Sequence, residues 1–326
     1  MGDVSRPAVL ITRAIPDPVL TRLASTCDVD LYTGANAIPR DELKARLAGK
    51  QALMCLLTDR IDAEVLDAAP GLRIVANIAV GFDNIDQAAA RARGIVITNT
   101  PDVLTEATAD LTWGLLLAVM RRIPEGERLL RRGEWKGWAI DFLLGSDLRH
   151  KQLGIVGFGR IGRAVAARAG AFGMRVVYTT LDADAPGPGS DCAGHARVTF
   201  DEVLEASDVI SLHVPLTPET RHLINRRTLA RMKRGACLIN TSRGQVVDED
   251  ALAWALRDGL IGGAALDVYE REPVVHPGLL ALENVVLAPH IGSATVETRT
   301  AMADLAARNV MAVLSGHAPL TPVLPG

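Results

Sequence analysis

One stretch decides the fold class: Leu153-Gly154-Ile155-Val156-Gly157-Phe158-Gly159-Arg160-Ile161-Gly162. A short apolar run leads into the pattern Gly-x-Gly-x-x-Gly, and the period of an amphipathic helix follows. Gly157 permits a tight turn, Gly159 lets the backbone approach a pyrophosphate, and Gly162 lets the helix pack closely on the strand. The first turn of such a helix also offers unpaired N–H groups to phosphates. This strand–turn–helix therefore predicts an α/β sheet that binds a dinucleotide.

The same alternation of apolar runs and helical segments extends on both sides of the fingerprint. In the second part of the chain, strands are predicted at residues 153–157, 174–178, 209–212, 236–240, 263–266 and 285–288, and helices at residues 161–171, 201–206, 218–232 and 248–258. Residues 182–194 form a low-complexity loop, and a last helix is predicted over residues 295–314. Continuous apolar strands that alternate with helices are typical of a parallel sheet covered on both faces.

The first hundred residues repeat this pattern. Strands are predicted at residues 9–11, 29–32, 52–57, 73–78 and 95–97, and helices at residues 17–24, 41–48, 62–68 and 86–93. A helix over residues 105–122 is apolar nearly all round, so it needs burial on more than one side, between domains or between subunits. We therefore predict two doubly wound, Rossmann-like parallel-sheet domains.

Length, charge and cysteine usage limit the class of protein. The 326 residues correspond to about two domains of roughly 150 residues each. A net charge of −3 argues against a protein that binds nucleic acid or a membrane surface by charge. Without a signal-peptide pattern or a run of roughly 18 apolar residues, we expect a cytoplasmic protein. The cysteines are widely spaced and predict buried free thiols, and neither they nor the histidines predict a metal site: Cys27, Cys55, Cys192 and Cys237.

The end of the second strand after the fingerprint bears on the choice between NAD and NADP. Thr180 stands where an acidic residue would bind the ribose 2′-hydroxyl, and Asp182 follows closely. No Arg or Lys lies between residues 176 and 194, which slightly favours NAD(H) and leaves NADP(H) open. We expect the cofactor to contact the fingerprint and the strand ends, at Gly157, Phe158, Gly159, Arg160, Ile161, Gly162, Thr180, Asp182, Val214, Pro215, Thr241 and Gly292.

Three ionisable residues follow later strands of the same series: Arg243, Glu272 and His290. Open α/β sheets bind ligands at the carboxyl ends of their strands. Arg offers a fixed fork to a carboxylate and can polarise the adjacent carbonyl group. His titrates near neutrality, which suits proton exchange with an alcohol oxygen, and a nearby Glu would favour the imidazolium and orient the ring. The set predicts hydride-transfer chemistry; the alternative for Arg243 and Glu272 is a structural salt bridge.

These motifs resemble the D-isomer-specific 2-hydroxyacid dehydrogenases, and are closest to the glyoxylate/hydroxypyruvate reductase branch. The resemblance runs from about residue 9 to residue 322, and is carried by residues 77–86, 98–105, 157–162, 242–244, 266–268 and 289–292. It implies that Arg243 binds the substrate carboxylate, that His290 is the acid/base, and that Glu272 pairs with His290. It also implies carboxylate binding by the backbone N–H groups at Val80 and Gly81. Two cofactor contacts are implied as well, at Asp267 for the nicotinamide amide and at Thr105.

The resemblance also implies how the chain divides. Residues 1–100 and 290–326 would form the substrate (catalytic) domain, and residues 101–289 the dinucleotide-binding domain inserted between them. The active site would lie in the cleft between the domains and close by hinge motion. Leu57 would give the substrate pocket an apolar wall. Trp138 is either a core residue or a neighbour of the substrate, which in a homodimer could be the substrate of the partner subunit.

The implied activity is hydride transfer between NAD(P)H and a small 2-oxo acid, such as glyoxylate or hydroxypyruvate, to give the D-2-hydroxy acid. Phosphite dehydrogenases share the Arg/Glu/His set but carry a Lys where this chain has Val80, so phosphite is the weaker alternative. An NADH-sensing corepressor is the alternative from another class, although the sequence shows no arm or tail for it. His213, at a strand end, would line the adenine pocket or serve a structural role.

Overall fold

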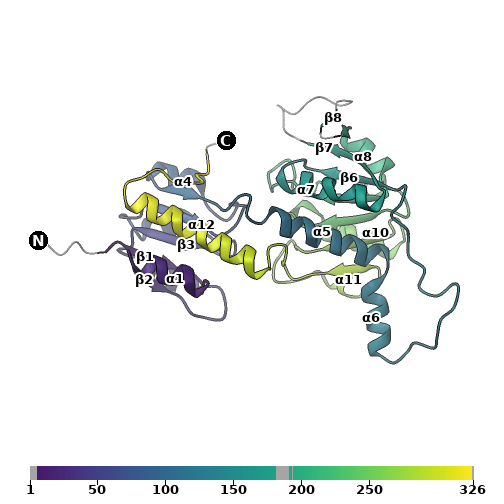
Figure 1. Cartoon of the computed structure of the whole chain (residues 1–326), viewed down its shortest axis with the longest axis horizontal. Coiled ribbons are helices and arrows are strands. Elements are labelled where there is room, and N and C mark those ends of the chain that lie inside the picture. The colour runs from purple at the N-terminus through teal and green to yellow at the C-terminus, as the bar shows by residue number, and fades with distance from the viewer. Residues whose placement is uncertain (1–5, 181–190, 193, 325–326) are drawn as a thin grey trace, which may run out of the picture. The chain divides into compact units, whose positions relative to one another are not determined.

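The computed structural model describes residues 6–180, 191–192 and 194–324. Asp182 and most of the predicted low-complexity loop lie outside the described residues. The chain divides into two compact units, one made of Met1–Leu104 with Ser293–Gly326 and the other of Thr105–Gly292. Each unit is an α/β sandwich, so the predicted fold class is confirmed (Figure 1).

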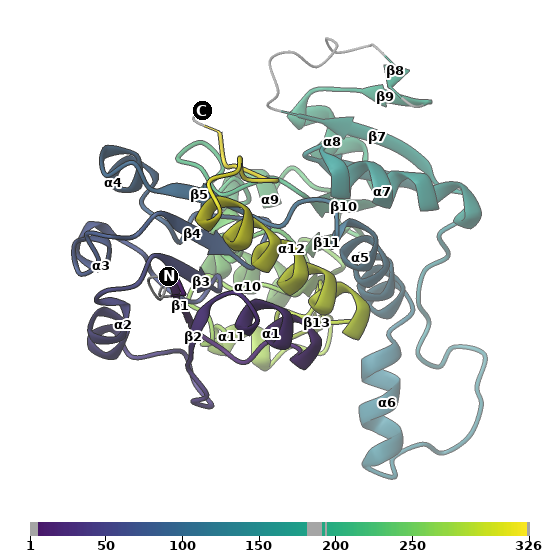
Figure 2. The same ribbon diagram turned by 60° about the vertical axis from the view of Figure 1, so that its left-hand side comes forward.

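The first unit contains a five-stranded parallel sheet in the order β2-β1-β3-β4-β5. The strands are β1 (Ala8–Ile11), β2 (Asp28–Leu31), β3 (Ala52–Cys55), β4 (Ile74–Asn77) and β5 (Val96–Thr98). Strands β3 and β4 are buried at every residue, which explains their continuous apolar sequence. The helices are α1 (Asp17–Ala24), α2 (Arg40–Leu47), α3 (Ala63–Asp67), α4 (Gln87–Ala92) and α12 (Val296–Leu314). Figure 2 shows α1 and α12 on one face of this sheet and α2, α3 and α4 on the other.

The second unit contains an eight-stranded sheet in the order β13-β12-β11-β10-β6-β7-β9-β8, which is parallel except for β8. The strands are β6 (Gln152–Val156), β7 (Arg175–Thr179), β8 (Asp191–Cys192), β9 (His195–Arg197), β10 (Val209–Leu212), β11 (Cys237–Asn240), β12 (Gly263–Leu266) and β13 (Val285–Leu287). The strand order reverses between β6 and β10. In doubly wound sheets a dinucleotide binds at this reversal, outside the carboxyl ends of the strands.

Two hydrophobic clusters cover the two faces of this second sheet. Helices α5 (Thr105–Met120) and α7 (Arg160–Ala169) contribute to one cluster, and α8 (Phe200–Ala206) and α10 (Glu249–Arg257) to the other. The remaining helices are α6 (Ile123–Arg131), α9 (Arg226–Leu229) and α11 (Pro277–Leu280), with short 3-10 turns at Gly170–Phe172 and Gly244–Val246.

Helix α5 owes its apolar sequence to packing inside the second unit. It packs against α7, β11 and β12, and the indole N–H of Trp113 donates to the carbonyl oxygen of Val165 at 3.0 Å. A position between domains or subunits is therefore not needed to explain this sequence. Seven exposed apolar side chains instead lie in the segment that follows α5: Ile123, Leu130, Trp135, Trp138, Ile140, Phe142 and Leu144.

The prediction of a helix over residues 218–232 is wrong for most of that range. Within it, only Arg226–Leu229 forms an α-helix. The hydroxyl of Thr220 donates to the carbonyl oxygen of Pro215 at 2.7 Å, and accepts the N–H of Thr217 at 2.8 Å. Such local side-chain bonds give the backbone an alternative to helix. His222 also has a left-handed φ of 50°, which ends any helix at that point. Helix α6 was not predicted.

Among the described residues, no helix is both long and apolar enough to cross a membrane. Cys27, Cys55 and Cys237 are free and buried. The described residues also contain no group of three or more His, Cys, Asp or Glu side chains arranged to hold a metal ion.

Candidate active site

The predicted catalytic residues follow three neighbouring strands. Arg243 follows β11, Glu272 lies in the segment after β12, and His290 follows β13. These strands are adjacent and parallel, so their carboxyl ends meet at one edge of the sheet. The imidazole Nδ1 of His290 lies 2.8 Å from a carboxylate oxygen of Glu272. The structure therefore brings together two side chains that are 18 residues apart in the sequence.

Glu272 is held as a carboxylate in this cluster. Burial alone would raise the pKa of Glu272, but the hydrogen bond and charge of His290, the Tyr269 N–H and the charge of Arg243 together bring this pKa below its ordinary value. The Tyr269 N–H donates to the second carboxylate oxygen at 3.0 Å. Because Nδ1 of His290 faces Glu272, Nε2 is the ring nitrogen left to exchange a proton with a substrate oxygen.

The backbone at His290 is fixed by a buried carboxylate. His290 has a left-handed φ of 55°, which is uncommon for a residue with a side chain. The two oxygens of Asp267 accept the N–H groups of Ile291 and Gly292, each at 2.7 Å. Burial raises the pKa of Asp267, and these two N–H groups oppose that shift. Asp267 therefore anchors the loop that carries His290; its predicted contact with a nicotinamide amide stays a prediction.

A turn built on Asn240 positions Arg243. The side-chain oxygen of Asn240 accepts the N–H and the hydroxyl of Ser242 at 3.0 and 2.8 Å, while its NH₂ group donates to the carbonyl oxygen of Arg243 at 2.9 Å. Gly244 packs directly on the peptide that follows Tyr269, and a Cβ atom at this position would lie 1.8 Å from the carbonyl carbon. The loops that carry Arg243 and Glu272 are thus tightly packed together. The sequence alone assigned no role to Asn240 or Gly244.

The fingerprint turn fits the phosphates of a dinucleotide. Gly157 has a φ of 95°, and a Cβ atom there would lie 2.6 Å from the His213 carbonyl group, at the reversal between β6 and β10. A Cβ atom on Gly162 would lie 2.2 Å from the Gly157 oxygen, so the helix approaches the turn closely. Gly159 is the N-cap of α7, and among the described residues no side chain caps this end and a Cβ atom on Gly159 would meet no atom within 4 Å. The first N–H groups of α7 therefore remain available to an anion.

The other predicted cofactor residues lie around this edge with different environments. Phe158 is buried, and its ring stacks on that of Tyr178 with the centroids 3.9 Å apart. The hydroxyls of Thr241 and Thr112 are 3.0 Å apart, which ties the end of β11 to α5. Thr180 directly follows β7, and its carbonyl oxygen accepts a hydrogen bond from Arg197 at 3.2 Å. The remaining predicted cofactor residues lie at the ends of helices and strands. Thr105 begins α5, and Arg160 and Ile161 lie in the first turn of α7. Val214 and Pro215 follow β10, and Gly292 follows β13.

Arg197 is a functional candidate that sequence reasoning missed. It lies in β9, which pairs with β7, so that Arg197 stands beside Tyr178 in the register. The sequence shows no cation in the segment directly after β7, but sheet pairing places one at the end of that strand. No local sequence signal identifies this neighbour, because the segment between the two strands is long.

The predicted substrate residues lie in both units. Val80 and Gly81 follow β4 in the first unit and are half-buried, and Leu57 follows β3 and is 37% exposed. Trp138 belongs to the second unit and is 81% exposed, so it is not a core residue of that unit. Its predicted place beside a substrate stays a prediction.

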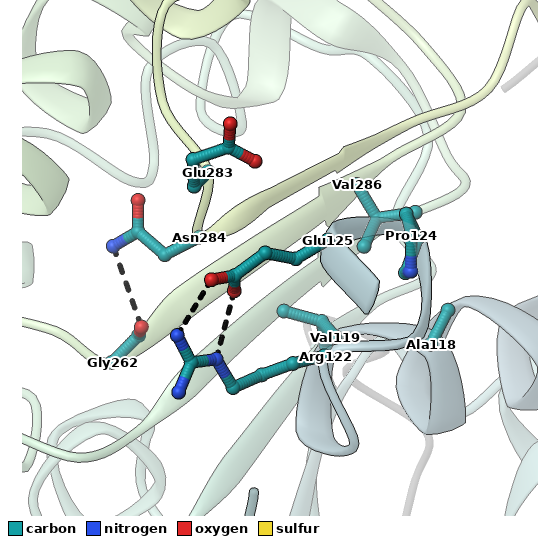
Figure 3. Close-up of a pocket in the computed structure, with 9 residues that line it drawn as sticks. All are labelled: Ala118, Val119, Arg122, Pro124, Glu125, Gly262, Glu283, Asn284 and Val286. Atoms are coloured by element: carbon teal, nitrogen blue, oxygen red, sulfur yellow. Dashed lines mark hydrogen bonds and ion pairs between the residues drawn. The ribbon is translucent and has the colours of Figure 1, made fainter. Parts of the chain in front are cut away.

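A cavity of about 400 Å³ lies at the opposite ends of the strands in the second unit (Figure 3). Gly262 and Asn284 line it, and they precede β12 and β13, whereas the catalytic residues follow these strands. Arg122 is paired with Glu125 at 2.7 Å, and Glu283 is paired with Arg128. This cavity is therefore separate from the edge that carries His290.

The chain is similar to known proteins in both sequence and fold. Residues 113–292 match the family model described as D-isomer specific 2-hydroxyacid dehydrogenase, NAD binding domain. A glyoxylate reductase of Thermofilum pendens is 49% identical over 97% of this chain and 94% of its own length. A solved structure from Thermus thermophilus has a TM-score of 0.91 and 50% identity, and covers 97% of this chain and 100% of its own.

A second solved structure carries a functional description. It is an NADPH-dependent glyoxylate/hydroxypyruvate reductase of Sinorhizobium meliloti in complex with NADP and malonate. Its TM-score is 0.85 at 40% identity, and the match covers 98% of this chain and 97% of the other. These relatives match nearly the full length of both chains.

Proposed function

This chain belongs to the D-isomer-specific 2-hydroxyacid dehydrogenase family, and from that premise we propose that it reduces glyoxylate or hydroxypyruvate to the D-2-hydroxy acid. The observation that carries the proposal is the contact of 2.8 Å between His290 and Glu272, at the strand edge that also carries Arg243. The similarity to glyoxylate reductases over nearly the whole chain supports the choice of substrate.

The residues of this edge supply binding and proton transfer. Arg243 binds the substrate carboxylate through its planar fork and polarises the neighbouring carbonyl group. His290 gives a proton from Nε2 to the carbonyl oxygen as it becomes an alcohol, while Glu272 holds Nδ1. A bound dihydronicotinamide supplies the hydride. The N–H groups of Val80 and Gly81 complete the carboxylate binding in this proposal.

Separate variants of Arg243 and His290 test these roles. Arg243→Ala should raise KM for glyoxylate and lower kcat, because it removes both carboxylate binding and carbonyl polarisation. His290→Asn should lower kcat by about 10² to 10⁴-fold with little change in KM, because it removes only the proton donor. A matched control is Arg257→Ala, since this side chain is 64% exposed and, among the described residues, its ion pair is with Asp258 at 3.8 Å. Unchanged kinetics in either active-site variant would remove that residue from the mechanism.

For the cofactor we favour NAD(H), because Thr180 and Asp182 offer no positive charge to a 2′-phosphate. One observation favours NADP(H) instead, the guanidinium of Arg197 beside the end of β7. The choice between NAD(H) and NADP(H) can be tested by steady-state rates. These are measured with NADH and with NADPH, in wild type and in Arg197→Ala. If NAD(H) is the cofactor, NADH gives the higher kcat/KM and the variant changes it little. A selective loss of NADPH activity of about tenfold in the variant would show that Arg197 binds the 2′-phosphate.

We also propose that the protein is a homodimer. Of the fourteen exposed large hydrophobic side chains among the described residues, seven lie between Ile123 and Leu144, in α6 and the segment that follows it. Exposed apolar groups concentrated in this way mark protein–protein contact surfaces. Trp138 lies in this segment and would reach the substrate of the partner subunit.

A further inference from the structure

We propose that Asn99 is a positioning residue for the substrate carboxylate, because its side chain orients the peptide that presents the Gly81 N–H group. This inference rests on the proposed function, in which the N–H groups of Val80 and Gly81 bind that carboxylate. It adds a residue from a different strand end, since Asn99 follows β5 whereas Val80 and Gly81 follow β4.

Three consecutive carbonyl groups of this loop are held by hydrogen bonds. The carbonyl oxygen of Ala79 accepts the N–H of Thr100 at 2.9 Å. The next one, of Val80, accepts the side-chain NH₂ of Asn99 at 2.7 Å. That of Gly81 accepts the side-chain NH₂ of Asn77 at 2.8 Å. The orientation of three peptide planes in a row is thereby fixed.

The held carbonyl groups determine where the N–H groups point. In a trans peptide the C=O and N–H bonds point in opposite directions, and among the described residues the one cis bond lies elsewhere, at Glu272-Pro273. The Ala79 carbonyl thus orients the Val80 N–H, and the Val80 carbonyl orients the Gly81 N–H. Neither N–H donates to another described residue, and both residues are only half-buried. Two adjacent N–H groups presented in this way form an anion-binding concavity.

Asn99 is better suited to a test than Asn77. Asn77 is fully buried, and it also exchanges hydrogen bonds with Asn84, so its loss would disturb the core. Asn99 is half-buried, and within the described part of the chain its side chain bonds to Val80 alone. Its backbone is anchored independently by Thr321, whose hydroxyl donates to the Asn99 carbonyl oxygen at 2.7 Å. Removing the side chain should therefore release the Val80–Gly81 peptide and leave the chain path intact.

The test compares Asn99→Ala and Asn99→Ser with wild type, each saturated with the preferred dinucleotide. We would titrate oxamate, a non-reducible carboxylate analogue, and would measure KM and kcat for glyoxylate. Both variants should raise the Kd of oxamate and the KM of glyoxylate together by about tenfold, as expected for one misdirected hydrogen bond to a charged group. The value of kcat and the Kd of the dinucleotide should stay within about twofold, which a general loss of structure would not allow.

Leu47→Ala is the matched control. Leu47 is fully buried in α2 of the same unit, so the variant should lower Tm and leave the Kd of oxamate unchanged. If both Asn99 variants keep the Kd of oxamate and the KM of glyoxylate within twofold of wild type, the inference is overturned. Failure of both variants to fold would also overturn it, because Asn99 would then be needed for stability. If wild type binds oxamate but reduces no 2-oxo acid, the proposed function fails and the oxamate titration alone decides the role of Asn99. If wild type does not bind oxamate, the proposed function and the inferred role of Asn99 both fail.

Discussion

At the scale of single residues, the proposed chemistry depends on the ionised state of Glu272. Its carboxylate has a depressed pKa because His290, the Tyr269 N–H and Arg243 outweigh the effect of burial. As pH falls, Glu272 should therefore take up a proton only below the usual range of glutamate, near 4.3. Above that pH, the Glu272 carboxylate remains ionised and keeps its hydrogen bond to His290.

This depressed pKa predicts the acid side of the pH–rate profile. The kcat/KM for glyoxylate should stay flat on lowering the pH to about 5, and should fall only below the ordinary glutamate value. Glu272→Gln removes the titrating group, so its activity should be lower at every pH and should lack this acid limb. Initial rates between about pH 3.5 and 7 check both points. An acid limb centred above pH 5 in wild type and retained in Glu272→Gln would assign the titration to another group.

His213 predicts a pH dependence of stability. Burial lowers the pKa of His213 to about 3, and its Nε2 lies 2.8 Å from the hydroxyl of Ser211. Between pH 6.5 and about 3 the unfolded chain binds a proton here and the folded chain does not. Stability is therefore lost as pH falls through this window, by at most about 1.4 kcal/mol per pH unit. His213→Gln should show a smaller fall in Tm between pH 7 and 5, and equal falls would exclude this role.

The candidate residues that the sequence indicates differ in a physical way from those that only the structure indicates. Arg243, Glu272 and His290 are predictable, because their side chains carry distinctive chemistry and each follows a strand. Arg197, Asn77 and Asn99 are not, because their importance comes from contacts that only strand pairing and loop packing create. An Asn after a strand is common in turns, and nothing local reveals which carbonyl group it holds.

At the scale of secondary-structure elements, the turn between β6 and α7 carries the dinucleotide proposal. Gly162→Ala would place a Cβ atom 2.2 Å from the Gly157 carbonyl oxygen, so helix and turn would have to separate. We expect this variant to weaken dinucleotide binding by at least tenfold, as measured by quenching of tryptophan fluorescence. Gly170→Ala is the matched control, because a Cβ atom at this position, the C-terminal end of α7, would meet no described atom within 4 Å. Equal affinity in both variants would show that the close approach is not required.

The elements also show where sequence patterns are reliable. The predicted strands are confirmed within a few residues, because parallel strands buried on both faces have continuous apolar sequences. The helix over residues 218–232 is wrong because short threonine side chains bond to nearby backbone groups and His222 takes a left-handed conformation. Strands β8 and β9 were missed because they are too short to give an apolar run.

At the scale of the whole molecule, the length of the chain predicts two domains, and the structure has two compact units. Length says nothing about how the chain divides. The predicted boundaries, near residues 100 and 290, came from resemblance, and the units change at Leu104–Thr105 and at Gly292–Ser293. The roles of the two units in substrate and dinucleotide binding stay part of the proposal.

The exposed apolar segment from Ile123 to Leu144 predicts a dimer. Light scattering should give a mass near twice the 34.7 kDa of the chain. Leu130→Glu places a charge on an exposed apolar side chain of α6, so it should shift the mass toward that of the monomer without lowering Tm by more than a few degrees. Val274→Glu, at an equally exposed apolar residue outside the segment, is the control and should remain dimeric. A monomeric wild-type protein would refute the dimer.

The central claim is that this protein reduces short 2-oxo acids. The most direct measurement is a steady-state panel that follows absorbance at 340 nm with NADH and with NADPH, against glyoxylate, hydroxypyruvate, pyruvate and, in the reverse direction, phosphite with NAD. We predict oxidation of at least one reduced cofactor by glyoxylate or hydroxypyruvate, and no reduction of NAD by phosphite, because Val80 offers no cation to a dianion. Folded protein that turns over none of the 2-oxo acids, or that reduces NAD with phosphite, would contradict it.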